Sequence, residues 1–157
     1  MFYEKQTILN LIMIHDLGEA KFGDSVKAYI NYTTDKEKEN LWCKNLYLQG
    51  THDGIADLTY YWKLWNEWHE NDNTNYNVRI VKELDELQLL YKLLLLLKQS
   101  EALNISYFSK KRVEDFWSLK QEIKTSEVKH IYNILIAGDE SFIQIANKYG
   151  ITINPMK

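Results

Sequence analysis

Residues 78–99 read VRIVKELDELQLLYKLLLLLKQ and predict the longest helix of the chain. The apolar residues of this stretch cover almost the whole circumference of a helix by residues 93–97, which is typical of a central, buried helix. Lys92 and Lys98 bracket only five leucines, a run far shorter than the ~18 apolar residues that a membrane-spanning helix needs. We therefore expect residues 78–99 to form the centre of a folded core.

The rest of the chain also predicts helices, because the residues that usually separate short strands are scarce. One Pro and six Gly occur among 157 residues. From the apolar spacing we expect further helices over residues 3–20, 35–48, 56–70, 110–123 and 126–137, with a final turn over 141–149. Breaks or loops are expected over residues 50–54, 71–77 and 104–109. The predicted fold is all-α, in a single domain over residues 1–157.

The composition excludes several classes of function. With 19 basic and 22 acidic side chains, the formal charge of −3 provides no basic field for a nucleic-acid backbone or an anionic membrane surface. The single Cys43 excludes a disulfide framework and has no nearby His to activate it as a nucleophile. The first ten residues, MFYEKQTILN, lack the pattern of a signal peptide. We expect a cytoplasmic protein with no nucleic-acid or membrane partner.

The first predicted helix ends in HDLGEAKFGD, residues 15–24, which groups residues suited to metal chemistry. The adjacent His15 and Asp16 can both bind one divalent cation where the chain bends at a helix end, and this ligand pair suits Mn, Fe, Co or Zn. Glu19 lies three residues after Asp16, so the two carboxylates are expected to share a helix face. Asp16 could then bind the metal while Glu19 transfers a proton. Asp24 would be a third carboxylate near the same site.

A His-Asp dipeptide alone is weak evidence, because the chain contains a second one. His52-Asp53 lies in a predicted loop between two Gly residues. Loop residues usually face solvent, and a lone pair of this kind is most often structural or solvated. We expect this second pair to have no catalytic role.

Asp85 lies midway along the longest predicted helix, on the face that it shares with Val81 and Leu84. A carboxylate directed into a core is costly unless it is paired or bound to a metal. Alternatively, Asp85 lies at the solvent edge beside Glu83 and Glu86, in an ordinary charged face. The periodicity leaves both interpretations open.

Together these residues resemble a known family. The string His15-Asp16-Leu-Gly-Glu19-Ala-x-x-Gly23-Asp24, followed by Lys82-x-Leu84-Asp85-x-x-x-x-Leu90, resembles the HD-domain metal-dependent phosphohydrolases. Within them the chain is most similar to the YfbR-like 5′-deoxynucleotidases. The segments Leu64-Trp65-Asn66-Glu67-Trp68 and Glu114-Asp115-Phe116-Trp117 resemble two further motifs of that family. The resemblance extends from about residue 3 to about residue 135.

The resemblance implies a fold, a metal and a reaction. It implies an HD-domain helical bundle that binds one divalent metal ion (Mn, Co, Fe, Zn or Mg) through His15, Asp16 and Asp85. It also implies that Glu19 is the catalytic acid/base for the attacking water and that Asp24 helps organise the substrate pocket. The implied reaction is hydrolysis of deoxynucleoside 5′-monophosphates to nucleoside and phosphate. The alternatives are an HD phosphohydrolase with a different nucleotide substrate, or a non-catalytic helical interaction module.

The chain departs from the family pattern at its N-terminal side. The family places a first His ligand on a helix before the His-Asp pair, but only fourteen residues precede His15 and none of them is a His. We therefore expect a member that lacks the N-terminal segment with this ligand. The apolar residues 8–14 would then expose a hydrophobic patch, which marks an interface with a partner or with a second copy in a homodimer.

Overall fold

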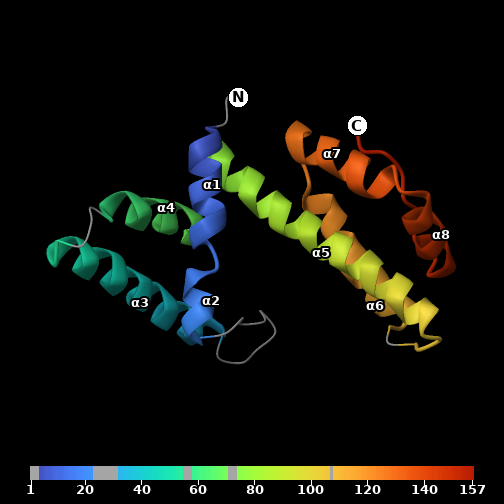
Figure 1. Ribbon diagram of the computed structural model, residues 1–157, viewed down its shortest axis with the longest axis horizontal. Coiled ribbons are helices and arrows are strands. Elements are labelled where there is room, and N and C mark those ends of the chain that lie inside the picture. The colour runs from blue at the N-terminus through green and yellow to red at the C-terminus, as the bar shows by residue number, and fades with distance from the viewer. Residues whose placement is uncertain (1–3, 23–31, 55–57, 71–73, 107) are drawn as a thin grey trace. The chain divides into compact units, whose positions relative to one another are not determined.

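The computed structural model describes residues 4–22, 32–54, 58–70, 74–106 and 108–157 (Figure 1). Every regular element in these ranges is a helix, which confirms the all-α prediction. The chain divides into two compact units, Met1–Val81 and Lys82–Lys157, so that the single domain stays a prediction. Within the described ranges, no helix combines the length and the apolar character needed to cross a membrane.

Helices of the first unit pack around one apolar core. They are α1 (Lys5–Ile14), α2 (Leu17–Phe22), α3 (Tyr32–His52), α4 (Thr59–His69) and the first turns of α5 (Tyr76–Ala102). Helix α1 packs on α4, α2 packs on α3, and α3 packs on α4 (Figure 1). The buried core residues are Leu11, Ile14, Cys43, Tyr47, Leu64, Trp65, Val78 and Val81. One face of α1 therefore contributes to the core while Leu9, Ile12 and Met13 stay exposed.

The first predicted helix is divided into two. Residues 3–20 were expected to be one helix, but α1 ends at Ile14 and α2 begins at Leu17, with His15 and Asp16 in the turn between them. The His15 side chain hydrogen-bonds the Ile12 carbonyl in the last turn of α1, an interaction that satisfies a helix-end acceptor. Asp16 directly precedes α2 and the Glu19 side chain is outside the described residues, so the shared face of these two carboxylates stays a prediction.

Helix α3 is longer than its sequence pattern indicates. It runs from Tyr32 to His52, so the predicted loop at 50–54 is wrong as far as His52. Gly50 is helical and buried because the Leu58 side chain lies directly against its Cα, where a larger residue would collide with it. The turn comes later, at Gly54, whose φ of +69° suits glycine.

The second unit contains the rest of α5 and the elements that follow it. These are α6 (Lys110–Trp117), a 3₁₀ helix η1 (Ser118–Glu122), α7 (Ser126–Tyr132), a π-helix η2 (Asn133–Ala137) and α8 (Glu140–Lys148). The buried face of α5 includes Leu87, Leu90, Leu93, Leu94 and Leu97. The expectation of a helix buried on all sides is wrong, since Leu89, Leu95 and Leu96 are 38–46% exposed. Five consecutive leucines point in every direction, but neighbours cover only part of the circumference.

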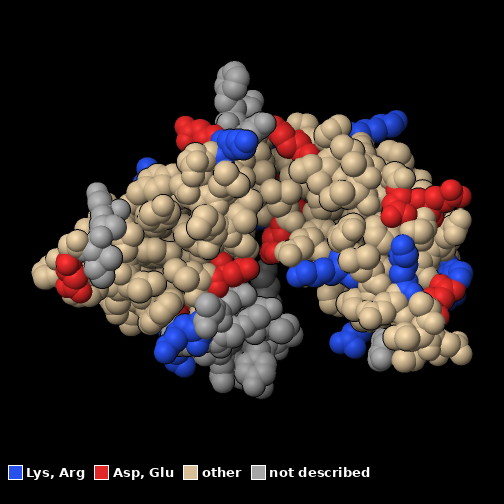
Figure 2. All heavy atoms as spheres, in the orientation of Figure 1, with Lys and Arg blue, Asp and Glu red and all other residues tan. Residues whose placement is uncertain are grey.

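The charged side chains form no continuous band on the face of each unit that Figure 2 presents. Acidic and basic residues lie there in small groups, and most of the surface is formed by uncharged residues. This agrees with the near balance of 19 basic and 22 acidic side chains in the sequence.

A buried carboxylate joins α5 to α7 in the second unit. Glu83, only 3% exposed, accepts hydrogen bonds from the backbone N–H of Thr125 at 2.7 Å and from its hydroxyl at 2.6 Å. Thr125 is the residue before α7, so Glu83 satisfies an N–H at the start of that helix from a distant position in the sequence. Negative charge is also favourable at a helix N-terminus.

We expect Glu83→Ala to lower the free energy of unfolding by about 3 kcal/mol, because it leaves two buried donors of Thr125 without this acceptor. Urea unfolding followed by circular dichroism measures the loss. Glu83→Gln, which keeps an acceptor oxygen, should lose less than Glu83→Ala. Equal stability of Glu83→Ala and the parent chain would contradict this account.

Candidate metal centre

His15 is held at the end of α1 by two contacts. Its Nδ1 lies 2.8 Å from the carbonyl oxygen of Ile12, and because a carbonyl only accepts, Nδ1–H is the donor. Its ring packs edge-to-face against the indole of Trp68, with the ring centroids 5.2 Å apart and the planes at 75°. Trp68 belongs to α4, which packs on α1. These contacts leave the His15 side chain 14% exposed and its Nε2 atom facing Asp16.

The spacing between His15 and Asp16 fits a shared cation. Nε2 lies 3.1 Å from Asp16 Oδ2. With the hydrogen on Nδ1, the neutral ring presents a lone pair at Nε2, and two such acceptors repel each other unless a proton or a cation lies between them. Two ligand atoms each about 2.1 Å from one ion and at right angles are about 3.0 Å apart, as in octahedral coordination. The residue types and their separation therefore both fit a divalent metal ion.

The second His-Asp pair has a different environment. His52 Nδ1 lies 3.3 Å from Asp53 Oδ1, and the two side chains are 83% and 49% exposed. Asp53 also accepts a hydrogen bond from Gln49. This pair lies at the solvent-exposed end of α3, which agrees with the expectation that it is solvated.

A buried carboxylate explains the Gly of the HDLGE motif. Gly18 is buried in α2, and a Cβ atom at this position would overlap the side chain of Glu39 on α3. Glu39 is itself 3% exposed and forms an ion pair with Lys36 at 2.8 Å. The sequence analysis did not identify Glu39 as a buried residue. The signal for its burial was its position one helical turn before the buried Cys43, on the same face of α3.

The structure describes the other predicted site residues, Glu19, Asp24 and Asp85, only in part. Glu19 lies in α2, but its side chain is outside the described residues, and Asp24 lies outside them altogether. Asp85 is half-buried on α5 in the second unit. Within the described part of the chain, no group of three or more His, Cys, Asp or Glu side chains is arranged to hold a metal ion. The full ligand set of His15, Asp16 and Asp85 therefore stays a prediction.

The helix that contains Asp85 buries a different carboxylate. One of the two interpretations left open by the sequence placed Glu83 in a charged solvent face, but Glu83 is buried and Asp85 is half-buried. Glu83 lies four residues before Leu87 and seven before Leu90, on the apolar stripe of α5. This spacing was the sequence signal for its burial.

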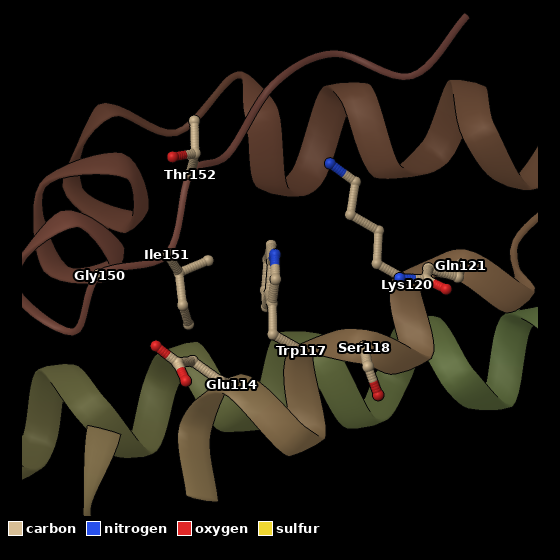
Figure 3. Close-up of a pocket in the computed structure, with 8 residues that line it drawn as sticks. All are labelled: Glu114, Trp117, Ser118, Lys120, Gln121, Gly150, Ile151 and Thr152. Carbon is tan, nitrogen blue, oxygen red and sulfur yellow. The ribbon is translucent and has the colours of Figure 1, made fainter. Parts of the chain in front are cut away.

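A pocket of about 290 Å³ in the second unit contains none of the predicted site residues. It is lined by Glu114 and Trp117 of α6, Ser118, Lys120 and Gln121 of η1, and Gly150–Thr152 of the C-terminal segment. Trp117 stands between Ile151 and Lys120 (Figure 3). Burial lowers the pKa of Lys120, whose Nζ donates to the carbonyl of Asn154 at 3.3 Å. These contacts attach the C-terminal segment to η1.

Cys43 is a core residue. Burial raises the pKa of its thiol to about 12, and the negative charge of Glu39 adds to the effect. Because the thiolate is the reactive form, Cys43 is not an activated nucleophile at neutral pH. This agrees with the sequence, which gave it no partner for such a role.

The comparisons with known proteins identify one family. A family model described as HD domain matches residues 3–132, which is most of the chain. No curated protein and no solved structure matches the chain. The matched residues include the His15–Asp16 pair and Asp85.

We expect Gly18→Ala to destabilise the chain by about 1–3 kcal/mol, because the added methyl group collides with the Glu39 side chain. Without that collision, alanine in a helix would be more stable than glycine by up to ~1 kcal/mol. Urea unfolding measures the change. In a double-mutant cycle, Gly18→Ala should cost less in a Glu39→Ala background. The same cost in both backgrounds would rule out the collision as its cause.

Proposed function

The chain belongs to the HD domain family, whose members are typically metal-dependent phosphohydrolases, and on this basis we propose that it is a 5′-deoxynucleotidase. It hydrolyses deoxynucleoside 5′-monophosphates to nucleoside and inorganic phosphate. The observation that carries the proposal is the His15–Asp16 pair, in which Nε2 and Oδ2 lie 3.1 Å apart at the break between α1 and α2. The resemblance of the surrounding motif to the YfbR-like enzymes supports the choice of substrate.

In the proposed site, His15, Asp16 and Asp85 hold one divalent ion, which is Mn, Co, Fe, Zn or Mg. When bound, the ion lowers the pKa of a bound water molecule and offsets charge on the phosphoryl oxygens. The hydrogen bond from His15 Nδ1 to the Ile12 carbonyl keeps the Nε2 lone pair available as a ligand. Asp16 supplies negative charge from the exposed side of the pair, with 63% of its side chain in solvent.

The proton transfer is assigned to Glu19. Its carboxylate accepts a proton from the attacking water while the water oxygen forms a bond to phosphorus. The bond between phosphorus and the 5′ oxygen breaks, and that oxygen receives a proton from Glu19 as the nucleoside leaves. Asp24 contributes to the substrate pocket.

The exposed apolar face of α1 favours a second candidate function. Leu9, Ile12 and Met13 are 46%, 41% and 79% exposed and lie on one side of the helix, since Ile12 and Met13 follow Leu9 by three and four residues. Such a face suits an interface. A non-catalytic interaction module, or a homodimer that covers this face, is therefore the alternative to an enzyme. A third hypothesis is an HD phosphohydrolase that acts on another nucleotide. Assays with a panel of nucleotide substrates distinguish it from the 5′-deoxynucleotidase.

Phosphate release from deoxyribo- and ribonucleoside 5′-monophosphates, with Mn²⁺ or Co²⁺ added, tests the proposal. We expect faster release from the deoxyribonucleotides, and a loss of about 10²–10⁴-fold in Glu19→Ala because the proton acceptor is removed. His15→Ala and Asp85→Ala should also lose release, since each removes a metal ligand.

His52→Ala is the matched control, because it removes the His of the exposed second pair and should leave phosphate release unchanged. Release that survives His15→Ala would contradict the assigned site. A folded parent chain that releases no phosphate from any nucleotide would favour the interaction module.

A further inference from the structure

We propose that Trp68 is a positioning residue for His15: its indole ring holds the imidazole in the orientation in which Nε2 faces Asp16 and the metal. This inference rests on the proposed function, because it concerns the metal ligand of the same site. The sequence placed Trp68 at the end of the segment Leu64-Trp65-Asn66-Glu67-Trp68, which resembles a family motif, and nothing in that segment identifies it as a neighbour of His15.

The position of the imidazole depends on two independent contacts. A histidine side chain rotates about two bonds, and the hydrogen bond from Nδ1 to the Ile12 carbonyl at 2.8 Å fixes one edge of the ring. That single bond leaves the ring plane free to tilt about the line that joins donor and acceptor. The edge-to-face contact with Trp68, at 5.2 Å and 75°, restricts this tilt. Nε2 is thereby kept near Asp16 Oδ2.

Trp68 is itself held by the packed core of the first unit. It packs against the core on α4, one turn after Trp65, which is 1% exposed. The Trp65 indole N–H donates to the side-chain oxygen of Asn40 on α3 at 3.2 Å, so α4 is tied to its neighbour. A ring anchored in this way can transmit the order of the core to a ligand at the surface. Outer-shell groups that orient a ligand typically change metal affinity 10–100-fold.

Three variants on α4 separate positioning from stability. Trp68→Leu keeps an apolar side chain and removes the ring, whereas Trp68→Phe keeps a ring. Trp62→Leu is the matched control, because Trp62 is also half-buried on α4 and packs against the same core. Calorimetric titration with Co²⁺ gives the dissociation constant of each chain. NMR of the metal-free chains follows the His15 ring protons and their nuclear Overhauser effects with the indole protons of Trp68.

We expect Trp68→Leu to raise the Co²⁺ dissociation constant about 10-fold and to shift the His15 ring resonances. Trp68→Phe should recover most of the affinity. Trp62→Leu should lose stability while it keeps the parental dissociation constant and His15 resonances. In the parent chain, Overhauser effects should connect the His15 ring to the Trp68 indole before any metal is added, a result that does not depend on the folding of a variant.

The inference is overturned by a parental dissociation constant in Trp68→Leu, by an equal loss of affinity in Trp62→Leu, by a missing Overhauser contact, or by a parent chain that does not bind Co²⁺. The proposed enzymatic function fails in a different way. A parent chain that binds Co²⁺ with the predicted dependence on Trp68 but releases no phosphate would refute the nucleotidase and retain the positioning role.

Discussion

The hydrogen bond between the His15 imidazole and the Ile12 carbonyl is the interaction on which the candidate site depends. It satisfies an acceptor at the end of α1, and in the same step it assigns the hydrogen of the neutral ring to Nδ1 and leaves the lone pair on Nε2. The chain turns at this point, so that Asp16 leaves the helix axis and its carboxylate comes within 3.1 Å of Nε2.

Buried carboxylates connect helices in both units. In the first unit, Glu39 on α3 lies against Gly18 of α2, and the ion pair with Lys36 offsets the cost of removing its charge from water. In the second unit, Glu83 on α5 is satisfied by two donors of Thr125 at the start of α7. Each carboxylate thus fixes the position of a short helix that could not be stable alone. Gly18 of the HDLGE motif is explained by packing, because a larger residue there would overlap the Glu39 side chain, and this explanation is separate from any catalytic role.

The sequence predicts the helices well and their interruptions poorly, for a physical reason. Apolar periodicity reports which residues face a core, and it is continuous through residues 8–14 and beyond, so it cannot show that α1 ends at Ile14 without a Gly or Pro. At the break between α1 and α2, the His15 side chain hydrogen-bonds the backbone carbonyl of Ile12, a contact that apolar periodicity does not report. The carboxylate that α5 buries follows from helical phase: Glu83 lies on the stripe of Leu87 and Leu90, while Asp85 is half-buried. The contact between Trp68 and His15 joins segments more than fifty residues apart, and no local pattern specifies it.

The two His-Asp dipeptides show how tertiary context decides the chemistry of a motif. In His52–Asp53 the imidazole nitrogen that faces the carboxylate is Nδ1. The His52 and Asp53 side chains are 83% and 49% exposed, so water can hydrogen-bond to either of them. In His15–Asp16 the Nδ1 atom donates to the Ile12 carbonyl, the ring packs against the Trp68 indole, and Nε2 faces the carboxylate, with 14% of the His side chain exposed. Water reaches both side chains of His52–Asp53, whereas at His15–Asp16 it reaches mainly the carboxylate, with 63% of the Asp16 side chain exposed. At His15–Asp16, a neutral ring with its hydrogen on Nδ1 places two acceptor atoms 3.1 Å apart, which repel each other until a proton or a cation lies between them, and the proposed metal ligation depends on this electrostatic condition.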